Sequence, residues 1–158
     1  MIAGGRFSHA GLVVATWFGV GLLPGAPGTW ASLAALPFAW VIHHFWGASG
    51  LVAGAFILFV IGVWAAEVAI HALNEDDPAS LVVDEVAGQW LTLAAAPFGF
   101  YWWLSGFLLF RLFDIWKPSP IRQVEVKFSG GFAVMADDIV AALYAVVLLL
   151  IGRYILGA

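Results

Sequence analysis

The fold is decided by one apolar stretch, VAGQWLTLAAAPFGFYWWLSGFLLFRLF, at residues 86–113. Pro97-Phe98-Gly99 interrupts it near the middle, and this combination commonly breaks or bends a helix. A continuous helix would hold Asp84 and Asp114, which flank the stretch, about 45 Å apart at 1.5 Å per residue. A fold-back near Pro97 would bring both ends to the same face as two short arms. We therefore expect a fold-back hairpin here.

The composition of the whole chain is that of a protein in lipid. Of its 158 residues, 63% are hydrophobic and only 10% are charged, whereas soluble domains carry about 25% charged residues. Too few polar groups remain to cover a surface in water, so we expect an integral membrane protein with one domain, 1–158. Six Lys and Arg residues make no basic stripe for nucleic acid, and without cysteine the chain has no thiolate nucleophile or cysteine-ligated zinc.

Three further stretches approach the length of about 20 apolar residues that spans a hydrocarbon core. They are residues 29–46, 50–73 and 139–156, the first two separated by a tight turn at 47–50. With the broken block they predict an all-α membrane bundle of about four spans. The N-terminal run lacks an A-x-A-like cleavage site at the right place, so we expect a retained interfacial or re-entrant helix there.

The orientation follows the basic residues, which concentrate on the cytoplasmic side of membrane proteins. Arg6 lies at the N-terminus, and Lys117, Arg122 and Lys127 lie in the longest loop, whereas Arg153 is near the opposite end of the last span. We expect the N-terminus and this loop to face the cytoplasm.

Pairs of carboxylates directly precede two of the apolar stretches. Asp84-Glu85 stands before residue 86 and Asp137-Asp138 before residue 139, while Asp114 follows the broken block. Helix capping is one explanation, because acidic groups complement the helix dipole. A cap needs only one side chain, however, and Mg²⁺ prefers oxygen ligands with one or two carboxylates. These five carboxylates predict a magnesium site.

Cations lie beside one of these carboxylates, in FRLFDIWKPSPIR at residues 110–122. Arg111, Asp114 and Lys117 share one face if the helix continues to Lys117, and the prolines then hold Arg122 in an extended segment. Arginine and lysine both bind phosphate, although Arg111 and Lys117 also fit an interfacial snorkelling role. Thr29 can cap the following helix, whose free N–H groups attract anions. We predict that Thr29, Arg111, Lys117 and Arg122 bind phosphate.

Two other groups of polar residues have simpler explanations. Asp76 and Asp77 fit an ordinary solvated loop, and Glu67 and His71 fit a local contact at i, i+4 on one helix face. Neither group enters the predicted site.

Four stretches resemble the phosphatidylglycerophosphatase A family. They are APGT at 26–29, DPASLVVDEV at 77–86, FRLFDIWKPSPIR at 110–122 and GGFAVMADD at 130–138, and their order covers nearly the whole chain. Ala133 and Ala142 stand where the family pattern has glycine.

The resemblance implies a multi-pass enzyme of the bacterial inner (cytoplasmic) membrane, with its active site facing the cytoplasm. It would hydrolyse phosphatidylglycerophosphate to phosphatidylglycerol and phosphate with Mg²⁺, in glycerophospholipid biosynthesis.

The residues leave several routes for phosphate hydrolysis. A cysteine nucleophile is excluded, and we find neither an Asp-x-Asp pair nor the Lys-x6-Arg-Pro signature of histidine-dependent lipid phosphatases. A metal-activated water, a carboxylate or Thr29 remains as nucleophile. We favour water, with the catalytic residues drawn from Asp84, Glu85, Asp114 and Asp138. The alternative function is a small ion or solute transporter, but the spans 29–46 and 139–156 carry almost no polar residues in their middles.

Overall fold

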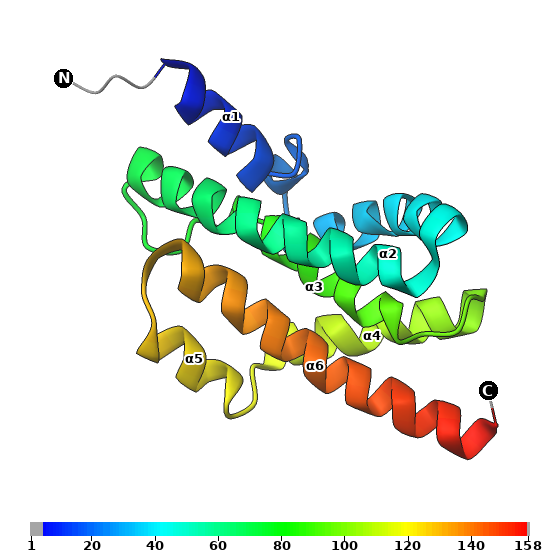
Figure 1. The fold of residues 1–158 in the computed structure, drawn as a ribbon. Helices are drawn as coiled ribbons and strands as arrows, with labels where there is room; N and C mark the ends of the chain where they lie inside the picture. Colours follow the sequence, from blue (N-terminus) through cyan, green and yellow to red (C-terminus); the bar gives the residue numbers. More distant parts are fainter. Residues whose placement is uncertain (1–4, 158) are drawn as a thin grey trace.

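The computed structural model describes residues 5–157, with the side chains of 9–123 and 127–157. Within these residues the chain forms helices and no strand, which confirms the all-α class (Figure 1). The elements are α1 (Gly5–Ala15), the short 3-10 helix η1 (Val20–Leu22), α2 (Pro27–Leu73), α3 (Val83–Ala94), α4 (Phe100–Trp116), α5 (Ile121–Lys127) and α6 (Gly130–Leu156). The expected N-terminal helix is present as α1. The side chain of Arg6 lies outside the described part of the chain.

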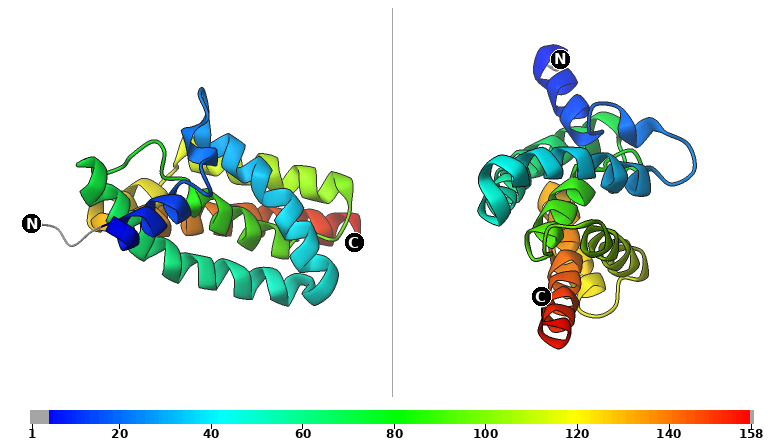
Figure 2. Two further views of the ribbon diagram at one scale, coloured as in Figure 1. Left: turned by 90° about the horizontal axis from the view of Figure 1, so that it is seen from above. Right: turned by 90° about the vertical axis from the view of Figure 1, so that its right-hand side faces the viewer.

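The long helix α2 reverses direction at Gly47. This residue has φ 64° and ψ −157°, a conformation that glycine adopts at no steric cost. The two views in Figures 1 and 2 show the second arm running back along the first. The four-residue turn expected at 47–50 is wrong in extent, because one glycine is enough to reverse the chain.

The apolar block 86–113 divides into α3 and α4, with residues 95–99 between them. Pro97 has no N–H to continue the helix. A Cβ atom placed on Gly88 would lie 2.5 Å from the Phe110 ring, and one on Gly106 would lie 3.2 Å from Leu93. The two helices therefore pack closely in opposite directions, and the start of α3 lies near the end of α4.

Helix α3 occupies the centre of the molecule, between α2 on one side and α4 and α6 on the other (Figure 2). Nine of its 12 residues are buried. The Trp90 indole N–H donates to the Ala35 carbonyl at 3.0 Å and so satisfies its polar atom within the core. Trp90 thereby fixes α3 against the first arm of α2.

The last helix begins at Gly130, earlier than the predicted start at residue 139. Asp137 and Asp138 therefore lie inside α6, and the capping explanation is wrong for this pair. The cap comes from α2, because the Glu67 carboxylate accepts a hydrogen bond from the Gly131 N–H at 2.8 Å. Glu67 is also 3.2 Å from His71, which confirms the local contact at i, i+4.

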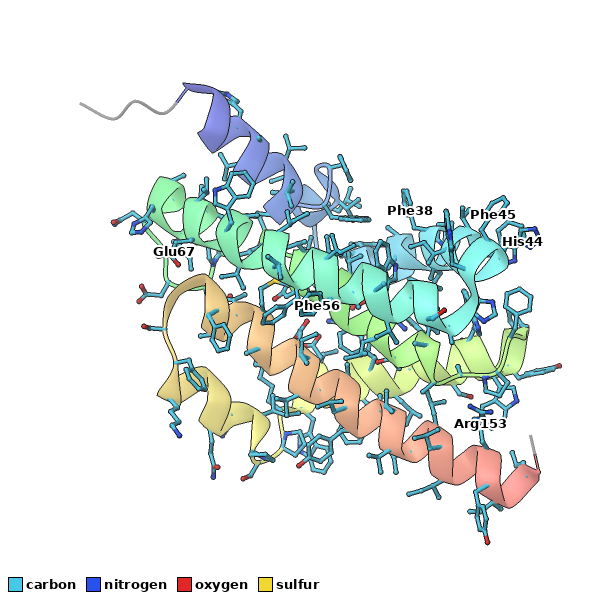
Figure 3. The ribbon with its side chains drawn as sticks, viewed as in Figure 1. Phe38, His44, Phe45, Phe56, Glu67 and Arg153 are labelled. Carbon is cyan, nitrogen blue, oxygen red and sulfur yellow. The ribbon has the colours of Figure 1, made fainter. Side chains whose placement is uncertain are left out.

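Arg153 lies near the opposite end of α6 from Glu67, as Figure 3 shows. Its guanidinium donates to the carbonyl of Ala95 at 3.2 Å. Ala95 is the C-cap residue of α3, where the last carbonyls of a helix lack partners within the helix. Arg153 therefore joins the ends of α3 and α6.

Large apolar side chains remain exposed along the outer helices. Phe45 and Phe56 of α2 are 69% and 68% exposed, and Ile155 of α6 is 72% exposed. Among the described helices, α2 and α6 are long and apolar enough to cross a membrane by length and composition.

The contact of α6 with α2 gives a prediction for stability. A Cβ atom on Gly131 would lie 2.3 Å from the Val63 carbonyl oxygen, so Gly131→Ala must push the two helices apart. We expect a loss of about 1–3 kcal/mol, as in overpacked cores, measured as a lower melting temperature in detergent. Gly152→Ala is the control, because its Cβ would meet nothing nearer than 3.6 Å. Equal melting temperatures for the two variants would contradict this packing.

Candidate active site

A cavity of about 500 Å³ lies where the starts of three helices meet the end of α4. Pro27 and Gly28 of α2, Asp84 and Glu85 of α3, and Gly130 of α6 all line it. Helix N-termini carry partial positive charge and free N–H groups, so their convergence favours an anion. The prediction that the start of α2 faces an anion site fits this arrangement.

The lining of the cavity is nevertheless strongly acidic. Seven carboxylates line it, together with one ammonium group, that of Lys117. The carboxylates belong to Asp76, Asp77, Asp84, Glu85, Asp114, Asp137 and Asp138. An anionic ligand entering this cavity needs a cation to offset the negative charge.

Three of the carboxylates form a compact cluster. Oxygens of Asp84, Glu85 and Asp138 lie within 4.8 Å of one another, so the cluster could hold a metal ion. Among the described side chains, Asp84 Oδ1, Glu85 Oε2 and Asp138 Oδ2 are buried oxygens without a hydrogen-bond partner. Buried polar atoms are normally paired, and a hard cation would satisfy all three. The donor set therefore fits a hard cation, which prefers oxygen ligands.

Burial makes the ionised forms of two of these carboxylates costly. Asp84 is only 8% exposed and lies beside the Glu85 carboxylate, so neither charge is well solvated. A bound cation would favour both ionised forms.

Arg111 and Lys117 balance part of the charge. The Arg111 guanidinium forms an ion pair with Asp114 and lies 3.8 Å from Glu85. The Lys117 ammonium lies 2.7 Å from Asp137. Helix α4 ends at Trp116, so Lys117 does not extend the predicted helix face but crosses to α6. The cations thus connect α4 to the acidic residues of both α3 and α6.

Gly28 allows the start of α2 to approach this cluster. A Cβ atom on it would lie 2.0 Å from Glu85 Oε1 and 3.1 Å from Arg111 Nη1. Any larger residue would displace the Glu85 carboxylate. The glycines of this segment therefore have a specific steric role at residue 28.

The structure brings most of the predicted site residues together. Asp84, Glu85, Asp114, Lys117, Asp137 and Asp138 line the cavity, and Arg111 pairs with two of them. Thr29 and Arg122 are not among the lining residues. The expected Thr29 cap is wrong because α2 already begins at Pro27, and the extended segment at Arg122 is wrong because α5 begins at Ile121.

Several polar residues near the site were not predicted from the sequence. Asp76 and Asp77 line the cavity although their loop suggested ordinary solvation. Ser32 and Gln89 are fully buried, four residues after Gly28 and Glu85 respectively. The four-residue spacing could have predicted that both lie close to the site, because residues four apart share one helix face.

The fold and the cavity define an all-helical protein with an acidic site at the ends of apolar helices. The sequence profile described as Phosphatidylglycerophosphatase A matches residues 13–153. The chain belongs to this family, which confirms the resemblance. No solved structure matches the chain significantly.

Three relatives resemble the chain over most of its length. Phosphatidylglycerophosphatase A of Escherichia coli is 38% identical over 153 residues, covering 94% of this chain and 87% of that protein. The protein of the same name from Haemophilus influenzae is 36% identical, covering 90% and 88%. A protein of Bacteroides thetaiotaomicron named "Putative phosphatidylinositol-3-phosphatase" is 37% identical, covering 96% and 99%.

The ion pair of Lys117 and Asp137 gives a second prediction. The two side chains are 26% and 6% exposed, so Lys117→Met leaves a buried carboxylate short of its cation at a cost of about 1–3 kcal/mol. We expect a fall in melting temperature, partly restored in the double variant Lys117→Met/Asp137→Asn. Lys127→Met, at an exposed position, is the control. No restoration in the double variant would mean that the pair does not account for the loss.

Proposed function

We propose that the protein hydrolyses the phosphomonoester of phosphatidylglycerophosphate, releasing phosphatidylglycerol and inorganic phosphate in glycerophospholipid biosynthesis. Membership of the phosphatidylglycerophosphatase A family carries the proposal. The cavity supports it, because helix N-termini, carboxylates and two cations meet there. The family does not favour the transporter alternative.

In this proposal the phosphate lies beside the N-termini of α2 and α3, facing Arg111 and Lys117. Arginine offers two parallel N–H donors and lysine a point charge, so both neutralise phosphoryl oxygens. Thr29 directly follows Gly28, which lines the cavity, whereas Arg122 lies in α5, and we include both as further phosphate-binding candidates. The acidic lining requires a further positive charge at the same point.

Asp84, Glu85 and Asp138 would hold Mg²⁺, with Asp114 and Asp137 as additional ligands. Their oxygen donors and the unpaired buried atoms described above support this assignment. When bound, Mg²⁺ would supply charge neutralisation at the phosphoryl group and make a nearby water more acidic.

We assign the nucleophile to a water molecule. Its oxygen attacks phosphorus while the bond from phosphorus to the glycerol oxygen breaks. One of the catalytic carboxylates, Asp84, Glu85, Asp114 or Asp138, accepts the proton from the water and passes it to the leaving alkoxide, so the carboxylate is regenerated. Arg111 holds Asp114 in a fixed orientation through their ion pair, so the carboxylate is positioned before the substrate arrives.

A second lipid phosphomonoester is a candidate substrate. The Bacteroides relative bears the name of a phosphatidylinositol-3-phosphatase and covers 96% of this chain. We therefore include phosphatidylinositol 3-phosphate in the test of the function, and we expect phosphatidylglycerophosphate to be the faster substrate.

We also propose a location and a topology. The protein would lie in the bacterial inner (cytoplasmic) membrane as a multi-pass protein of about four spans. These would be the two arms of α2, a fold-back hairpin of α3 and α4, and α6. The site would face the cytoplasm, because Lys117, Arg122 and Lys127 lie in the segment beside it. The exposed apolar side chains of α2 and α6 would contact lipid.

The activity gives the third prediction. Purified protein in detergent should release phosphate from phosphatidylglycerophosphate with Mg²⁺ and lose this activity when a chelator removes the metal. Asp84→Asn, Asp114→Asn and Asp138→Asn should each lower kcat by about 100-fold or more, because each alters charge neutralisation at the reacting phosphate. Glu75→Gln, in an exposed loop outside the cavity, is the control. Full activity in all three Asn variants would refute the site.

The topology gives the fourth prediction, which the absence of cysteine from the chain makes simple to test. In bacterial spheroplasts, a membrane-impermeant maleimide should label Ser49→Cys, beside the reversal of α2 at Gly47, but should not label Gln123→Cys in α5. Disruption of the membrane should expose the second cysteine. Labelling of Gln123→Cys in sealed spheroplasts would reverse the proposed orientation.

A further inference from the structure

A second cavity, of about 390 Å³, lies between the first arm of α2 and α4. Leu33, Leu36 and Trp40 line it from α2, and Trp103, Leu104 and Phe107 line it from α4. No charged side chain is among its lining residues. The same two helices contribute Gly28 and Asp114 to the lining of the acidic cavity, so the apolar cavity and the acidic cavity share two walls.

The depth of the apolar cavity can be estimated from the helix rise of 1.5 Å per residue. Leu33 and Trp40 lie about 8 and 18 Å along α2 from Gly28. Leu104 lies about 15 Å along α4 from Asp114. One leaflet of a bilayer hydrocarbon core is about 15 Å thick, half of about 30 Å. The cavity therefore extends over the depth that an acyl chain occupies below a phosphate held in the acidic cavity.

Aromatic rings close the far end of the apolar cavity. The His43 ring stacks on Phe98 with centroids 5.0 Å apart, and the Trp103 ring meets Phe98 edge-on at 5.5 Å. His43 comes from the first arm of α2, Phe98 from the segment between α3 and α4, and Trp103 from α4. The rings therefore connect the two walls at the end of the cavity farther from the acidic site.

We propose that this cavity binds an acyl chain of the lipid whose phosphate lies in the acidic cavity. The inference rests on the proposed function, which supplies a substrate with a charged headgroup and apolar chains. Three observations on the structure support it: the shared walls, the matching depth and the apolar lining.

Leu104→Trp tests the proposal by filling the cavity. Two substrates are compared: phosphatidylglycerophosphate with long acyl chains, and a form with six-carbon chains, which end short of Leu104. We expect kcat/KM for the long-chain substrate to fall by about tenfold or more, chiefly through KM, while the short-chain value changes little. Leu108→Trp is the matched control, because Leu108 is 56% exposed on the same helix and does not line the cavity.

The outcomes separate this proposal from the function on which it rests. No phosphate release by the unaltered protein from either substrate would refute the proposed function itself. An active protein in which Leu104→Trp leaves both substrates unchanged, or slows both equally, would refute the acyl-chain site alone. An equal chain-length effect in Leu108→Trp would also refute it, because that residue lies outside the cavity.

Discussion

The structure depends on the need to neutralise negative charge within one cavity. Seven carboxylates line this cavity, with Lys117 beside them and Arg111 paired to two of them. Isolated buried carboxylates are costly, and each of the surrounding helices contributes something that lowers the cost. The starts of α2, α3 and α6 turn their positive dipole ends toward the cavity. The remaining negative charge makes the same cavity suitable for a divalent cation and, with that cation, for phosphate.

The cost of placing charge beside apolar helices explains which parts of the structure could be predicted from the sequence. Long apolar stretches predict helices, so the all-α class and the break near Pro97 could be predicted directly from residue type. The sequence also predicted a common site for five carboxylates, because a carboxylate beside an apolar stretch is costly unless it is paired, solvated or bound to a cation. These are Asp84, Glu85, Asp114, Asp137 and Asp138. Each of these residues lines the cavity.

Helix boundaries and long-range partners were less accessible. Residues 130–138 begin with two glycines and end with two carboxylates, a composition that does not predict a helix. The helix forms there nonetheless, and its first turn is stabilised by Glu67 of α2. The position of Asp77 in the cavity likewise depends on how its loop folds over α3, which no local pattern encodes. Thr29 and Arg122 were assigned from residue type alone, whereas α2 already begins at Pro27 and a further helix begins at Ile121.

The bond from Arg153 to the Ala95 carbonyl has a consequence for the chemistry at the other end of the molecule. The acidic cluster takes Asp84 and Glu85 from the first turn of α3 and Asp138 from the first half of α6, and Arg153 joins the same two helices near their last turns. The two helices are also in close contact between these points, with the Asp138 carbonyl 3.1 Å from where a Gly88 Cβ would lie. The spacing of the carboxylates therefore depends on contacts at both ends of the helix pair, and a change at Arg153, far from the cavity, would be felt by the acidic cluster.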